Sequence, residues 1–154
     1  MTREETIAVL AQLRAGCPQS YLKLTEEDAN GMVALWQELF AETPAALVSA
    51  AIKTYLWNST NSYFPSIGAI REQVEEIEHI CDRCSYGFTL HELMGDETNK
   101  YPKTVQETIE KVYKHRYKER YGLPFCSQTI RAQRKAALAG RTAGSKALLE
   151  GTQK

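Results

Sequence analysis

Apolar residues recur at helical spacing along most of the chain, and this pattern predicts an all-α protein. The first segment carries Ile7, Leu10 and Leu13 on one helical face. A second apolar stripe, over residues 32–40, follows Thr25 and the acidic residues that favour a helix start. No alternating run of apolar and polar residues between turn residues indicates a strand.

Two further helices are expected before residue 81. The third is expected to begin with Thr43 as its cap and Pro44 at its first helical position, where the missing amide costs nothing. The fourth runs from about residue 67 to residue 80, with Ser66 as its cap. Gly68, in its first turn, is expected to let another backbone approach closely. Residues 1–80 are therefore predicted to form a small bundle of about four helices.

The second half of the chain is predicted to be helical as well. Thr89 and Glu92 have the spacing of a capping box, and the stretch Gly95 to Lys103 has the composition of a linker. A fifth helix is expected to end at about Tyr121.

These segments suggest three parts. A helical bundle over residues 1–80 precedes a cysteine-containing connector over residues 81–104. Residues 105–154 form a basic helical extension for partner binding, and whether it is folded before binding is left open.

Charge separates the two halves of the chain. The 154 residues have no net charge, but residues 1–80 carry 5 Lys and Arg against 11 Asp and Glu, a balance of −6. Residues 81–154 carry 14 against 8, a balance of +6. Either the basic half faces an anionic or acidic partner, or the halves partly neutralise each other within one fold.

The fifth helix ends in the stretch "KVYKHRYKERYG", which combines tyrosines four residues apart with basic residues. Such a helix could stack on nucleic acid, dock on an acidic protein surface, or use its tyrosines to cover a core. All three interpretations remain open. The candidate partner-binding residues here and in the basic segment that follows are Lys111, Lys114, Arg116, Tyr117, Arg120, Arg131, Arg134 and Lys135.

A C-x2-C pair, Cys81 and Cys84, is the one feature that suggests a metal. With His91 and one further ligand it could form a zinc site, although structural zinc sites usually use two such pairs. The alternative is that the two cysteines end the fourth helix as small, partly buried residues. We expect no cofactor.

The sequence offers no catalytic constellation and no nucleotide-binding loop. The three histidines lie near no evident nucleophile. The stretch "GRTAGSKA" over residues 140–147 lacks the spacing and the final hydroxyl of a phosphate-binding loop, and no strand precedes it. A signal peptide and a membrane-spanning apolar run are also lacking, so a non-enzymatic cytoplasmic protein is predicted.

Three motifs carry a resemblance: the opening "MTREE", the segment "LWQELF" at 35–40, and "FPSIG" at 64–68. Over roughly residues 1–80 the chain resembles the proteins that tailed bacteriophages encode to load and inhibit their replicative hexameric helicase. The resemblance implies a phage replication protein that binds the helicase ring, holds it inactive and delivers it to the origin through an origin-bound organiser protein. It also implies a helicase contact in the C-terminal region.

Two other functions stay open beside this one. One is a non-enzymatic DNA-binding module that uses the basic, tyrosine-rich helix over residues 105–121, whose affinity should fall steeply with salt. The other is a helical structural or regulatory phage protein.

Overall fold

The computed structural model describes residues 1–21, 24–60, 63–133 and 136, and every regular element in them is helical. The all-α prediction is therefore confirmed. The elements in chain order are α1 (Arg3–Gly16), η1 (Pro18–Tyr21), α2 (Glu26–Leu39), α3 (Ala45–Asn58), α4 (Ile67–Cys84), α5 (Leu90–Met94), η2 (Gly95–Lys100) and α6 (Lys103–Tyr121). Residues 127–133 are helical too.

Local capping explains where most of these helices begin. The hydroxyl of Thr89 accepts from the amide of Glu92, whose carboxylate accepts from the amide of Thr89, as the spacing predicted. Thr2 and Thr25 make the same reciprocal pairs at α1 and α2. Ser66 caps α4 as predicted, because its Oγ accepts from the amide of Ala69 at 3.1 Å.

Three expectations about the first helices are wrong. Helix α3 begins after Pro44, which is itself the capping residue, and Thr43 makes no side-chain cap there. A Cβ on Gly68 would meet only the Ser66 hydroxyl at 3.8 Å, so no other backbone approaches it. Ile7 is 48% exposed, because α1 buries the face that carries Val9, Leu10 and Leu13 instead.

The stretch between residues 95 and 103 is ordered by short-range helical hydrogen bonds rather than being a plain linker. It forms η2, and the following Tyr101 is buried. The Tyr101 hydroxyl donates to Glu76 Oε1 at 2.7 Å, which fastens the stretch to α4. Because Asp, Glu, Thr and Asn are common in turns, their presence did not distinguish this arrangement from a loop.

The "FPSIG" stretch joins α3 to α4 and closes one end of the core. The ring of Phe64 meets that of Trp36 edge-on, with centroids 6.1 Å apart, and Pro65 is buried. Trp36 also packs on Phe40 at 5.3 Å. The aromatic residues of two separate motifs therefore meet in one cluster, which fixes the entry angle of α4.

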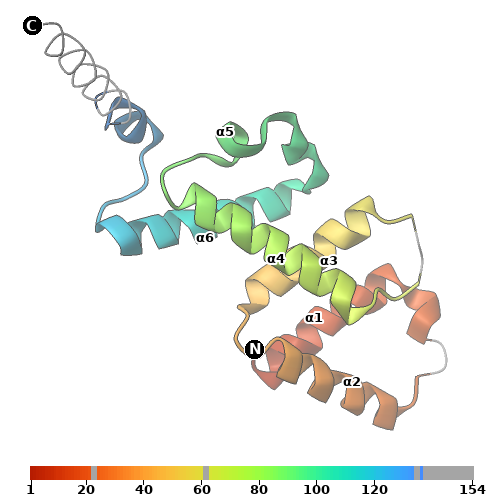
Figure 1. Cartoon of the computed structure of the whole chain (residues 1–154). Helices are drawn as coiled ribbons and strands as arrows, with labels where there is room; N and C mark the ends of the chain where they lie inside the picture. Colours follow the sequence, from red (N-terminus) through yellow and green to blue (C-terminus); the bar gives the residue numbers. More distant parts are fainter. Residues whose placement is uncertain (22–23, 61–62, 134–135, 137–154) are drawn as a thin grey trace, which may run out of the picture.

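Helices α4 and α6 run in the same direction, and α5 with η2 forms the crossover between them (Figure 1). Tyr101, just before α6, bonds to Glu76, and Arg120 near the end of α6 pairs with Asp82 near the end of α4. One continuous apolar core includes residues from α1 to α6. The expected boundary at residue 80 lies inside α4, and the three-part division stays a prediction.

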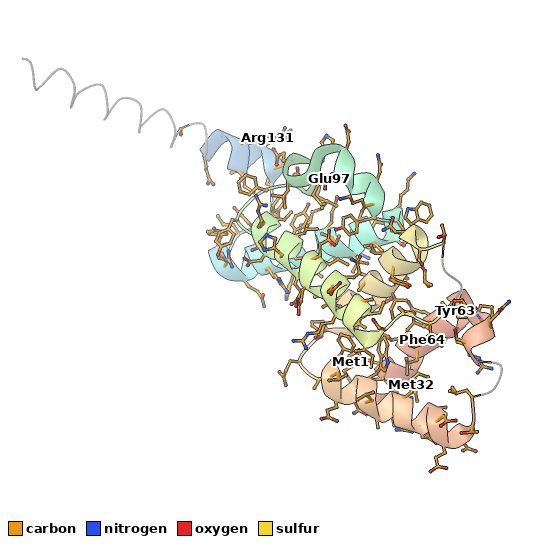
Figure 2. All side chains as sticks on the ribbon, turned by 45° about the vertical axis from the view of Figure 1, so that its right-hand side comes forward. Met1, Met32, Tyr63, Phe64, Glu97 and Arg131 are labelled. Carbon is orange, nitrogen blue, oxygen red and sulfur yellow. The ribbon has the colours of Figure 1, made fainter. Side chains whose placement is uncertain are left out.

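The two ends of the molecule differ in what they present. Met1, Met32 and Phe64 lie at the end formed by α1 and α2, whereas Arg131 lies at the opposite end (Figure 2). None of the helices within the described residues is both long and apolar enough to cross a membrane.

Candidate partner-binding surface

The inner face of α6 belongs to the core. Val105, Ile109, Tyr113 and Tyr117 follow each other at four-residue spacing, and all four are buried. Burial raises the pKa of the Tyr113 hydroxyl above its ordinary value. Tyr121, the third tyrosine of the predicted stripe, is 46% exposed and lies 4.7 Å from Tyr117, centroid to centroid. Two of the three tyrosines therefore cover the core and only the last reaches the surface.

Two arginines of α6 pair with carboxylates of α4. Arg116 Nη2 lies 3.7 Å from Glu78 Oε1, and Arg120 Nη2 lies 3.3 Å from Asp82 Oδ1. These pairs repeat at four-residue spacing on both helices, which is the spacing that keeps side chains on one face. They tie the C-terminal ends of the two helices together, and positive charge there also complements two parallel helix dipoles.

The remaining predicted basic residues occupy different surroundings. Lys114 Nζ pairs with Glu110 at 2.9 Å on the outer face of α6, and Lys111 is exposed. Arg131 Nε donates to Glu92 Oε1 at 2.9 Å, which links residues 127–133 to α5. Arg134 and Lys135 lie outside the described residues. The predicted residues thus do not form a single free basic stripe in the part of the chain that the structure describes.

The structure places Cys81 and Cys84 in the last turn of α4 with no exposed surface. The Cys81 thiol points to the carbonyl oxygen of Ile109 at 3.9 Å. Desolvation raises the pKa of Cys81 to about 11 and that of Cys84 to about 12, whereas zinc binds the thiolate form.

His91 lies on α5 and is exposed. Over the described ranges, no group of three or more His, Cys, Asp or Glu side chains is arranged to hold a metal ion. Cys81 and Cys84 therefore fit the role of small, buried core residues better than that of metal ligands.

Residues 123–133 fold back over the end of α6. The ring of Phe125 meets those of Tyr113 and Tyr117 edge-on, with both centroid distances 5.2 Å, and Ile130 is 5% exposed. A groove of about 190 Å³ lies beside this segment, with Tyr117, Leu123, Pro124 and Ile130 among its lining residues. Sequence reasoning missed this groove, although the Gly-Leu-Pro-Phe turn at 122–125 was the signal that the chain reverses there.

Exposed aromatic residues continue this surface on the end of α4. Tyr86, directly after that helix, is 54% exposed, and the Arg120 guanidinium lies over its ring at 3.7 Å from the centroid. Because Asp82 holds the same guanidinium, Tyr86 is supported in one orientation. Sequence reasoning did not single out Tyr86, because its arginine partner lies 34 positions later.

Comparison with known protein families identifies the other half of the molecule. Residues 1–71 match the family model for the N-terminal domain of the gene 39 protein, a phage helicase loader and inhibitor. This part of the chain is loader-like. The predicted resemblance to phage proteins that load and inhibit a helicase is thereby confirmed over these residues. Searches of curated proteins and of solved structures found no match.

The loader match covers α1, α2, α3 and the first turn of α4. It therefore includes the aromatic cluster of Trp36, Phe40 and Phe64 that joins α2 to the start of α4. Two of the motifs that suggested the family are thus parts of one packing cluster. The surface at the ends of α4 and α6 lies outside the matched residues.

Proposed function

We propose that this protein binds a replicative hexameric helicase stoichiometrically, inhibits it away from DNA and helps to load it at the phage origin. The observation that carries this proposal is the match of residues 1–71 to the N-terminal domain of a phage helicase loader and inhibitor. An origin-bound organiser protein is the further partner that loading at a defined site requires.

A stoichiometric mode of action fits the sequence of the chain. The stretch at 140–147, which lies outside the described residues, lacks the pattern of a phosphate-binding loop. ATP hydrolysis during loading therefore falls to the helicase, and the loader acts by binding and release. A ligand that binds one helicase state better than another shifts the ring toward that state, which is sufficient for inhibition.

Size-exclusion chromatography with light scattering tests the proposal directly. The full chain is mixed with the cognate hexameric helicase, with and without ATP, and the mass of the complex gives the ratio of the two proteins. We expect a defined complex whose stability depends on ATP, and inhibition of unwinding in the same mixture. If no complex forms in either condition, the proposed function is wrong.

The contribution of the C-terminal residues is tested by deletion of residues 134–154. A deletion from residue 123 would also remove Phe125 and Ile130, which pack on the fold, and would confuse lost binding with lost stability. Deletion after Gln133 removes five Lys and Arg and one Glu and leaves the described packing in place. Weaker helicase binding by this variant is expected, and unchanged binding would remove the tail from the interface.

DNA binding by α6 is the alternative that the same material tests. Stacking on nucleic acid would have to use Tyr121, because Tyr113 and Tyr117 are buried. Titration of a fluorescent oligonucleotide at several salt concentrations distinguishes the two functions. A steep loss of affinity with salt favours the DNA-binding module, since phosphate contacts release counterions.

A further inference from the structure

The groove beside residues 123–133 has the features of a site for an apolar side chain. Tyr117, Leu123, Pro124 and Ile130 are among the residues that line it. Leu123 is 55% exposed and Tyr121, two residues earlier, is also exposed. Such a cluster of apolar and aromatic residues around a hollow is typical of the centre of a protein–protein interface.

The surroundings of the groove are strongly positive. Residues 111–133 contain six Lys and Arg against one Glu. Arg120 and Tyr86 form a stacked pair on the neighbouring surface, and Tyr and Arg are among the residues most often found as strong contributors to binding. Charge complementarity therefore selects an acidic partner.

A protein fits this surface better than a nucleic acid. The lining includes the aliphatic side chains of Leu123, Pro124 and Ile130, which make no flat platform on which successive bases could stack. Arg116 and Arg120 are paired with Glu78 and Asp82, so they are not free to follow a phosphate backbone. A partner side chain that enters the hollow would instead bury apolar surface against the aliphatic lining.

We propose that this groove, together with Tyr86 and Tyr121, receives an apolar side chain from an acidic segment of the helicase. The inference rests on the proposed function and names the helicase-binding surface within the folded part of the chain. The supported position of Tyr86 means that little side-chain entropy is lost when the partner binds.

The test compares two leucine-to-glutamate substitutions in the full chain. Leu123→Glu places a carboxylate at the mouth of the groove, where it opposes both apolar contact and an acidic partner. Leu35→Glu is the matched control, because Leu35 is 46% exposed on α2, at the other end of the molecule. Far-UV circular dichroism and thermal unfolding establish that both variants keep the wild-type fold.

Helicase affinity is measured by fluorescence anisotropy for the wild type and both variants. We expect Leu123→Glu to weaken binding about tenfold or more and Leu35→Glu to change it by less than about twofold. If the wild type binds and Leu123→Glu binds equally well, the groove is not the helicase site, although the proposed function stands.

Two further results would also overturn the inference. If the wild type does not bind the helicase at all, the proposed function falls and this inference falls with it. If Leu123→Glu binds the helicase normally but loses binding to a single-stranded oligonucleotide, the surface belongs to nucleic acid. If Leu123→Glu loses its fold, Tyr86→Ala replaces it, since Tyr86 is an exposed side chain whose loss leaves the core intact.

Discussion

Glu92 is the residue at which the most local and the most distant contacts of the second half meet. Its carboxylate accepts from the amide of Thr89 at 2.9 Å, which begins α5, and it also accepts from Arg131 at 2.9 Å. The hydrogen bond from the Thr89 backbone is the largest cause that lowers the pKa of Glu92 to about 2, and Arg131 adds to it. One carboxylate therefore stabilises both a helix start and the return of residues 123–133.

This lowered pKa predicts a specific acid dependence of stability. Because the folded-state pKa lies below the ordinary value of about 4.3, the contribution of Glu92 is fully present above that value. It is lost as the pH falls toward 2. We expect Glu92→Gln to be less stable than the wild type at neutral pH, and this difference to close between about pH 4.3 and about pH 2.

Urea unfolding at a series of pH values measures that difference. The control is Glu72→Gln, which removes a carboxylate from an exposed position on α4. A constant difference between wild type and Glu92→Gln across the acid range would show that the carboxylate contributes no pH-dependent stability.

At the scale of the elements, helix ends and helix interiors respond in opposite ways to the same substitution. Gly122 ends α6 with φ of +69°, a left-handed conformation that a residue with a Cβ adopts only with strain. Gly31 lies inside α2, where glycine is less favourable than alanine. An added Cβ would meet no neighbouring atom within 4 Å at either position, so backbone conformation alone decides the outcome.

We therefore expect Gly122→Ala to destabilise the protein by about 1 kcal/mol and Gly31→Ala to stabilise it by about 0.5–1 kcal/mol. Chemical denaturation of the two variants beside the wild type gives both values, and each variant serves as the control for the other. Equal signs for the two changes would contradict this account.

The sequence predicted the elements better than their neighbours. A capping box such as Thr89 with Glu92 is complete within four residues, so its outcome depends on local chemistry. The ion pairs between α4 and α6 each span 38 positions, and they exist only because the two helices run in the same direction. Tyr117 was predicted to face a partner, yet its ring lies against Phe125, which no local pattern could indicate.

The whole molecule depends on residues that follow its last long helix. Phe125 and Ile130 bury apolar surface at the end of α6, where the Phe125 ring lies against Tyr113 and Tyr117. Residues after 133 contribute none of this packing in the described part of the chain. The boundary of the stable fold therefore lies after Ile130 rather than at Gly122.

Two truncated chains test that boundary. A chain of residues 1–133 should unfold within about 0.5 kcal/mol of the full chain. A chain of residues 1–122 should lose about 2 kcal/mol or more, because burial of one large apolar side chain contributes about 1.5–3 kcal/mol. Thermal and urea unfolding measure both, and equal stability of the two fragments would mean that the return segment does not stabilise the fold.

The shared position of α4 has a kinetic consequence. Ile70 on this helix lies in the core that also holds Trp36, while Cys81 near its other end lies against Ile109 of α6. A local opening that releases one half would therefore strip α4 of part of its cover, and the helix has no independent route to solvent. Hydrogen exchange at the amides in the middle of α4 should then report the free energy of unfolding of the entire chain, while those of α5 exchange through smaller openings.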